Sequence, residues 1–184
     1  MKQAYQLKIK LRGFKPSVYR TILVSPDKTF EDLHNYIQQL FDFDGYHLYD
    51  FYDKKEDLRI VIDDESYEPG DKYANKTKLK EVLKNEKDKI TYTYDFGDSW
   101  TFDITLEKIV ETKDKLPKVL RWKWGFLIED CGWVRGLWYL IMIYENKDEK
   151  KAENMWYDDL EMLEDELKET IFKEIDWKNF KLED

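Results

Sequence analysis

The chain has 184 residues and a formal net charge of −9; 42% of its residues are apolar and 16% are aromatic. A chain of this length hides roughly 70% of its unfolded surface on folding, so we expect one folded domain over residues 1–184. The negative charge disfavours a protein that binds nucleic acid non-specifically, because such proteins neutralise phosphates with clustered Lys and Arg. The single cysteine, Cys131, excludes an internal disulfide and an all-cysteine zinc site.

The sequence shows neither the pattern of a membrane span nor that of a signal peptide. No run approaches the roughly 18 consecutive apolar residues that a spanning helix needs, and the first ten residues, MKQAYQLKIK, lack an apolar core. We therefore expect a cytoplasmic protein without a membrane partner.

The first part of the chain predicts two strands, a helix and two further strands. Residues 5–12 alternate between apolar and polar side chains, which is the pattern of a half-buried strand. Thr29 lies three residues before Asp32, as in a capping box, and apolar residues then recur at helical spacing. In chain order, these elements are expected over residues 5–12, 18–24, 29–41, 46–52 and 58–62.

The second part of the chain predicts another hairpin followed by helices. Residues 90–94 and 100–106 have strand patterns, and the DFGDS sequence between them suits a tight turn in which Gly97 has a positive φ. We expect loops over residues 63–76 and around Pro117, and a short helix near residues 79–83. Two helices, over residues 137–144 and 156–171 and separated by a solvated charge run at 147–153, make the C-terminal part helical from about residue 137 to 184. The elements together predict an α+β fold.

Four segments in this order resemble one known family: Arg12–Arg20 (RGFKPSVYR), His47–Phe51 (HLYDF), Tyr94–Trp100 (YDFGDSW) and Glu129–Gly132 (EDCG). The closing stretch Ile175–Leu182 (IDWKNFKL) is also similar, so the resemblance covers nearly the whole chain. The family is named after the third open reading frame of a root-inducing plasmid and includes passenger proteins of some insertion elements. The resemblance implies an α+β fold with a β-grasp-like ββαββ start, and no established reaction.

The chain departs from the family pattern at residues that look able to hold zinc. Fuller members carry a second histidine two places after the first, and two cysteines upstream of the EDCG cysteine. At the corresponding places this chain has Tyr49, Val119 and Phe126. His47 and Cys131 remain, and two ligands cannot form a structural zinc site, which takes four. We therefore expect no bound metal or cofactor, and an apolar cluster around Cys131 in place of the zinc.

One candidate functional cluster combines the histidine, the cysteine and several acids of these motifs. His47 and Cys131 could form a pair that generates a thiolate nucleophile, although a free cysteine is more often packed in the core. The acids could converge on a divalent cation, with Asp42 and Asp44 nearby; capping of turns by aspartate is the more common use. The cluster consists of His47, Asp95, Asp98, Glu129, Asp130 and Cys131.

Two further groups form a candidate contact surface. The polar side of the first strand carries Lys8, Lys10 and Arg12, with Lys15 and Arg20 nearby, and could meet an anionic partner; ordinary alternation predicts a solvated strand face.

Trp122 and Trp124 alternate across one lysine and could form a platform for stacking or protein contact. Packing in the core is the more common fate of such side chains.

Two functions remain open from the sequence. The preferred hypothesis is a non-enzymatic binding or interaction module with an unidentified protein partner, because no complete catalytic set is visible in the sequence. The alternative is a small metal-assisted hydrolase or nucleic-acid-processing enzyme that uses the acidic cluster. An enzyme should bring at least three of the five groups His47, Asp95, Asp98, Glu129 and Asp130 together in one concave site, whereas a binding module should show them dispersed beside exposed aromatic side chains.

Overall fold

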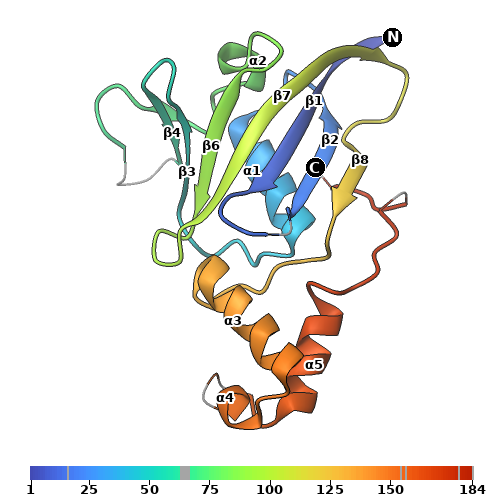
Figure 1. Ribbon diagram of the computed structural model, residues 1–184. Helices are drawn as coiled ribbons and strands as arrows, with labels where there is room; N and C mark the ends of the chain where they lie inside the picture. Colours follow the sequence, from blue (N-terminus) through green and yellow to red (C-terminus); the bar gives the residue numbers. More distant parts are fainter. Residues whose placement is uncertain (16, 63–66, 154, 156, 178, 184) are drawn as a thin grey trace.

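The computed structural model describes residues 1–15, 17–62, 67–153, 155, 157–177 and 179–183. Its described elements form one mixed sheet of eight strands with helices (Figure 1), which confirms the α+β prediction. In chain order they are β1 (Lys2–Leu11), β2 (Tyr19–Val24), α1 (Phe30–Phe41), β3 (Tyr49–Asp53), β4 (Leu58–Val61), β5 (Lys72–Tyr73), α2 (Leu79–Val82), β6 (Lys89–Tyr94), β7 (Trp100–Thr112), β8 (Lys118–Lys123), α3 (Trp133–Asn146), α4 (Glu149–Glu153) and α5 (Leu160–Glu169). Among the described residues, no helix is long and apolar enough to span a membrane.

The sheet has the strand order β5-β4-β3-β6-β7-β1-β2-β8. Its strand pairs are antiparallel apart from the parallel pair of β4 and β5. The order ββαββ at the start of the chain is as expected, but β6 and β7 lie between β3 and β1 in the sheet. The second hairpin is therefore central to the sheet and joins its two halves.

One face of the sheet packs on α1, and this contact holds the core. The helix begins with the predicted capping box, in which Thr29 Oγ1 accepts from Asp32 N and the Asp32 carboxylate accepts from Thr29 N. At the two ends of α1, Phe30 packs on Phe51 of β3 and Phe41 packs on Phe102 of β7, with ring centroids 5.0 and 4.7 Å apart. The alternating apolar residues of β1 and β7 are buried on the same side, as their period of two requires.

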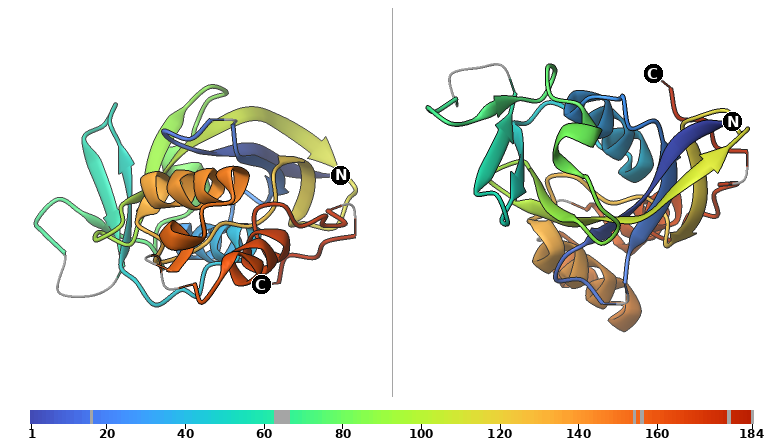
Figure 2. Two further views of the ribbon diagram at one scale, coloured as in Figure 1. Left: turned by 60° about the horizontal axis from the view of Figure 1, so that its bottom comes forward. Right: turned by 90° about the horizontal axis from the view of Figure 1, so that it is seen from above.

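The three C-terminal helices lie together at the end of the sheet opposite the N-terminus (Figures 1 and 2). The helix predicted over residues 137–144 starts four residues earlier, at Trp133, and the predicted charge run contains the short helix α4. The last helix is α5, which is shorter than expected, and residue 156 of the predicted range lies outside the described residues.

Two strands lie in segments for which the sequence predicted loops. β8 pairs with β2 at one edge of the sheet, with Ile22 opposite Val119. Of the six residues of this edge strand only Val119 is buried, so apolar and polar side chains do not alternate clearly along it. The two-residue strand β5 is too short to leave a sequence pattern.

Arg20 is a structural residue and does not belong to the basic surface that the sequence suggested. It is 0% exposed and donates hydrogen bonds to the carbonyls of Tyr19, Leu40, Lys123 and Gly125. Its guanidinium carbon lies 4.7 Å from the ring centre of Phe41 and 4.3 Å from that of Trp177. A planar cation with five donors suits such a site, so Arg20 ties β2 to α1, to the segment after β8 and to the C-terminal residues. Burial lowers its pKa to about 9.

Candidate functional site

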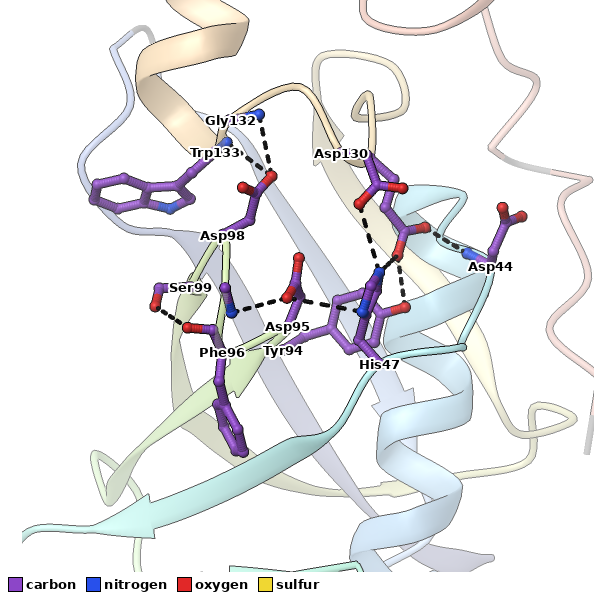
Figure 3. A network of polar contacts seen from close by, with 12 residues as sticks. Asp44, His47, Tyr94, Asp95, Phe96, Asp98, Ser99, Asp130, Gly132 and Trp133 are labelled. Carbon is purple, nitrogen blue, oxygen red and sulfur yellow. Dashed lines mark hydrogen bonds and ion pairs between the residues drawn. The ribbon is translucent and has the colours of Figure 1, made fainter.

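Three segments that are far apart in the sequence meet at the end of the sheet nearest α3 (Figure 3). His47 lies between α1 and β3, Asp95 begins the turn between β6 and β7, and Glu129 and Asp130 lie between β8 and α3. Backbone hydrogen bonds fix this arrangement: Asp95 N donates to Leu48 O over 3.0 Å, and Leu127 N donates to Phe41 O over 3.0 Å. These bonds place the two acidic segments on either side of His47.

The imidazole of His47 has carboxylates at both of its nitrogens. Nδ1 lies 3.8 Å from Asp95 Oδ1, while Nε2 lies 3.5 Å from Asp130 Oδ1 and 3.8 Å from Glu129 Oε1. Asp95 and Glu129 are shielded, with side chains 11% and 12% exposed, whereas Asp130 is 77% exposed. The cluster is therefore closed on the protein side and open to solvent at Asp130.

Glu129 is held in one orientation by two hydrogen bonds. Tyr94 Oη donates to Glu129 Oε1 over 2.6 Å, and Asp44 N donates to Glu129 Oε2 over 2.7 Å. Burial, and the hydrogen bond to this carboxylate, raise the pKa of Tyr94. Tyr94 thus remains a hydroxyl donor at neutral pH, and Glu129 remains an acceptor with a fixed position.

The turn that carries Asp95 differs from its prediction. Gly97 was expected to have a positive φ, and this expectation is wrong: Asp95 and Ser99 take the left-handed conformation, with φ of 54° and 57°. Aspartate and serine tolerate this because their side chains bond to nearby backbone groups. Gly97 N donates to Asp95 Oδ1 over 2.9 Å. A Cβ at position 97 would lie 3.2 Å from the same oxygen, so the glycine leaves room for the Asp95 carboxylate.

Asp98 has a different role from Asp95, although both lie in the same turn. Its Oδ2 accepts from Gly132 N over 3.1 Å and from Trp133 N over 3.0 Å, at the start of α3. A carboxylate at a helix N-terminus satisfies free backbone N–H groups and is favoured by the helix dipole. Asp98 therefore fixes α3 against the hairpin.

Cys131 is a buried thiol. It is 7% exposed, and its Sγ donates to Trp133 O over 3.6 Å. Burial, with a contribution from the charge of Asp98, raises the pKa of the thiol to about 12. A thiol with such a pKa is a poor nucleophile at neutral pH, and the nitrogens of His47 face carboxylates, so this geometry does not favour the Cys–His nucleophile.

Tyr49, Val119 and Phe126, which stand where the family resemblance implies metal ligands, lie in the core. Val119, Phe126 and Cys131 are all buried in the one apolar core. Tyr49 stacks on His34, with ring centroids 3.7 Å apart and planes 9° apart. These side chains do not offer the donor set of a four-ligand zinc site, and direct contact of Cys131 with Val119 or Phe126 stays a prediction.

Two of the three basic residues of the candidate contact surface contact neighbouring side chains. Lys8 Nζ lies 4.7 Å above the ring of Tyr19, Arg12 pairs with Asp103, and Lys10 is exposed.

Trp122 and Trp124 are half-buried and line a groove of about 420 Å³ next to Trp177 and Phe172. Both tryptophans pack on aromatic neighbours, so they are partly core residues, and a contact role for them stays a prediction.

The sequence did not single out three aromatic residues in the segments that form the site. Tyr94 donates a hydrogen bond to Glu129. Tyr46 and Phe96, the neighbours of His47 and Asp95 in the sequence, are 88% and 48% exposed. Tyr94 and Phe96 belong to the YDFGDSW segment, so the family resemblance of this segment could have drawn attention to them. Strand alternation indicated only that Tyr94 is buried.

Comparisons with known proteins agree with the resemblance seen in the sequence. The chain matches the family described as "Plasmid pRiA4b ORF-3-like protein" over residues 3–181. It is 29% identical over 104 residues to "Uncharacterized protein y4hQ" of Sinorhizobium fredii, a match that covers 56% of this chain and about half, 53%, of that relative. It is also similar to the crystal structure of a protein of unknown function, MM3350, from Methanosarcina mazei Go1, with a TM-score of 0.72, 29% identity and coverage of 84% of this chain and 88% of that one. The chain belongs to the plasmid pRiA4b ORF-3-like family.

Proposed function

We propose that the chain binds a divalent transition-metal cation through His47 Nε2, Glu129 and Asp130, and uses it for metal-assisted hydrolysis. The observation that carries this proposal is the pair of carboxylates next to Nε2 together with a third carboxylate next to Nδ1. Metal-binding histidines commonly donate their second N–H to a carboxylate, which fixes the ring and raises its basicity. Asp95 has the position of that orienting group.

The donor types fit such a cation, and so do the two distances from His47 Nε2 to the carboxylates. Imidazole and carboxylate donors suit Zn²⁺ and its neighbours in the first transition series. Ligand atoms about 2.1 Å from a metal lie roughly 3.0–3.4 Å from one another in octahedral or tetrahedral geometry. The separations of 3.5 and 3.8 Å from His47 Nε2 to the two carboxylates are within a few tenths of an ångström of these values. Among the described residues, the donor atoms that all lie within 4.8 Å of one another are those of His47, Asp95 and Asp130, so the Glu129 carboxylate has to move closer to Asp130 to share a cation with it.

Three protein ligands leave a coordination position open, as in catalytic metal sites. Held by these residues, a cation such as Zn²⁺ would lower the pKa of a bound water, which could then supply hydroxide near neutral pH. Hydrolysis adds that water across one bond of the substrate and needs no redox partner. The solvent-exposed Asp130 marks the open side of the site. Four of the five groups named from the sequence meet here, which agrees with the convergence expected of an enzyme. Of these four, Glu129 and Asp130 line the cavity at this place.

A titration with Zn²⁺ or Mn²⁺ in a calorimeter tests the cation site. We expect one cation per chain, an affinity loss of at least a hundredfold in His47→Ala and Asp130→Asn, and a smaller loss of about ten- to a hundredfold in Asp95→Asn, as for other orienting groups. Asp165→Asn is the matched control, because Asp165 lies in an acidic groove on α5 with Asp159, Glu161 and Glu169. Equal losses in this control, or no bound cation, would contradict the proposed cation site.

The non-enzymatic binding module is the second candidate, and it is favoured by the exposed side chains of Tyr46 and Phe96, the sequence neighbours of His47 and Asp95. Exposed aromatic side chains are common anchors of protein contacts. Hydrolysis of p-nitrophenyl esters and of bis(p-nitrophenyl) phosphate by the Zn²⁺-loaded protein separates the two functions. Turnover that His47→Ala abolishes supports the hydrolase, whereas tight cation binding without turnover favours the binding module.

A further inference from the structure

A cavity of about 240 Å³ opens next to the proposed cation site and shares two of its residues. Glu129 and Asp130 form one side of this α3 cavity. The rest of its wall is mainly apolar: Ile128 and Leu140 are buried core residues, and Met155 packs against the core. The apolar cavity thus adjoins the segment that carries Glu129 and Asp130.

Two further described residues line the cavity, Cys131 and Tyr157. Cys131 lines the cavity with a buried side chain and adds weakly polar surface. Tyr157 brings a hydroxyl, and burial raises its pKa to about 12, so that it stays protonated and can donate a hydrogen bond.

The position of the cavity relative to the cation site is fixed by α3. Leu140 lies on this helix, and Asp98 holds the start of the helix to the β6–β7 turn through Gly132 N and Trp133 N. Asp95 begins the same turn and lies beside His47. The hairpin therefore positions both the cation site and one wall of the cavity, so a ligand can contact both sites without rearrangement of the fold.

We infer that the substrate of the proposed hydrolase carries a short apolar group beside the bond that is cleaved, and that this group occupies the α3 cavity while the cleaved bond lies at the cation. This inference rests on the proposed function. Pockets for drug-sized ligands measure roughly 300–1,000 Å³, so a cavity of about 240 Å³ takes a part of a ligand, such as a short alkyl chain, and leaves the rest outside. The hydroxyl of Tyr157 donates to a polar atom of the ligand.

A series of alkyl hydroxamates tests the inference, because the hydroxamate group chelates Zn²⁺ and the alkyl chain can be lengthened one carbon at a time. With the Zn²⁺-loaded protein we expect affinity to rise about fourfold for each added methylene until the cavity is full. In spectra of protein labelled at Ile, Leu and Met methyl groups, the signals of Ile128, Leu140 and Met155 should shift. The exposed Met162 on α5 is the internal control and should not shift.

Two variants separate the cavity from the cation site. Met155→Trp should fill the cavity and remove the dependence on chain length, while Zn²⁺ affinity is retained; Met162→Trp is the same substitution away from the cavity and should change neither. Tyr157→Phe keeps the volume and should weaken all hydroxamates about equally.

If Zn²⁺ binds but acetohydroxamate and hexanohydroxamate bind equally well, or if Met162 shifts as much as Met155, the cavity inference is wrong and the proposed function stands. If Zn²⁺ does not bind, both are wrong.

Discussion

His34 should make the stability of the protein depend on pH in the mildly acidic range. The imidazole is on α1, is buried, and stacks on Tyr49, while its Nδ1 lies 2.7 Å from Tyr92 Oη. Gln38 Nε2 donates to the same hydroxyl oxygen over 3.0 Å, which leaves the Tyr92 proton free to point at His34. Neutral His34 is therefore the acceptor of this bond, and a proton on Nδ1 would remove it.

The size of the effect follows from the two pKa values of His34. Burial lowers its pKa from 6.5 to about 4. Because the folded-state pKa lies below the unfolded-state value, the unfolded chain takes up the proton first, and stability falls as the pH drops from about 6.5 towards 4. Above pH 6.5 the contribution is fully present. With these values, linkage gives a loss of about 2 kcal/mol between pH 7.5 and pH 5.

Urea unfolding at pH 7.5 and pH 5 measures this loss, and the chain contains its own control. The protein has two histidines, His34 and His47. The wild type and His47→Gln should both lose about 2 kcal/mol more than His34→Phe, which keeps an aromatic ring against Tyr49 but cannot be protonated. Carboxylates that titrate in this range contribute equally to all three proteins. If His34→Phe shows the same pH dependence as the wild type, the assignment to His34 is refuted.

Three other predictions follow from single side chains. Trp100→Ala should lower the free energy of unfolding by about 3–5 kcal/mol, since Trp100 is 0% exposed; a loss below about 1 kcal/mol in urea melts would contradict its place in the core. Gly97→Ala should leave the fold intact but weaken Zn²⁺ binding about tenfold, because the new Cβ crowds Asp95 Oδ1 at 3.2 Å; unchanged affinity in the calorimeter would count against the orienting role of Asp95. Cys131 should resist iodoacetamide at pH 8 in the native state and react after unfolding, because burial raises its pKa to about 12; rapid native labelling, detected by mass spectrometry, would disprove this.

Much of the fold was predictable because local patterns and burial agree. The alternation of residues 100–106 describes the buried face of β7, and the capping box at Thr29 marks the start of α1 within one residue. The missed length of β7 and the missed strand β8 have a common cause. Beyond Leu106 the side chains of β7 are half-buried or exposed, and β8 buries one residue, so pairing there depends on backbone hydrogen bonds to β1 and β2, which leave little trace in a hydrophobic pattern.

The candidate site was only partly predictable, because its parts come from turns. The sequence identified acids that could converge, but it could not separate Asp95, which faces His47, from Asp98, which holds α3. These residues are three positions apart in one turn, and both are aspartates in a context that suits capping. The sequence likewise could not distinguish the buried Arg20 from the exposed Lys10. Burial of a charged residue depends on distant segments, here the C-terminal Trp177, that no local window contains.

The segments that carry the family resemblance meet in space as two groups, and each group has a physical reason. Arg20 ends the first segment, and Trp177 lies in the closing one. The buried guanidinium of Arg20 lies over the buried ring of Trp177, so these two segments pack together in the core. The other three segments supply His47, Asp95, Glu129 and Asp130, which meet at a partly exposed place. Packing accounts for the first group. Packing does not explain why the acidic residues meet at His47, because an ion pair of a carboxylate as exposed as Asp130 adds little to stability. A cluster of three carboxylates around one histidine carries mutual repulsion that a bound cation would remove, and this is the physical argument for testing metal binding there first.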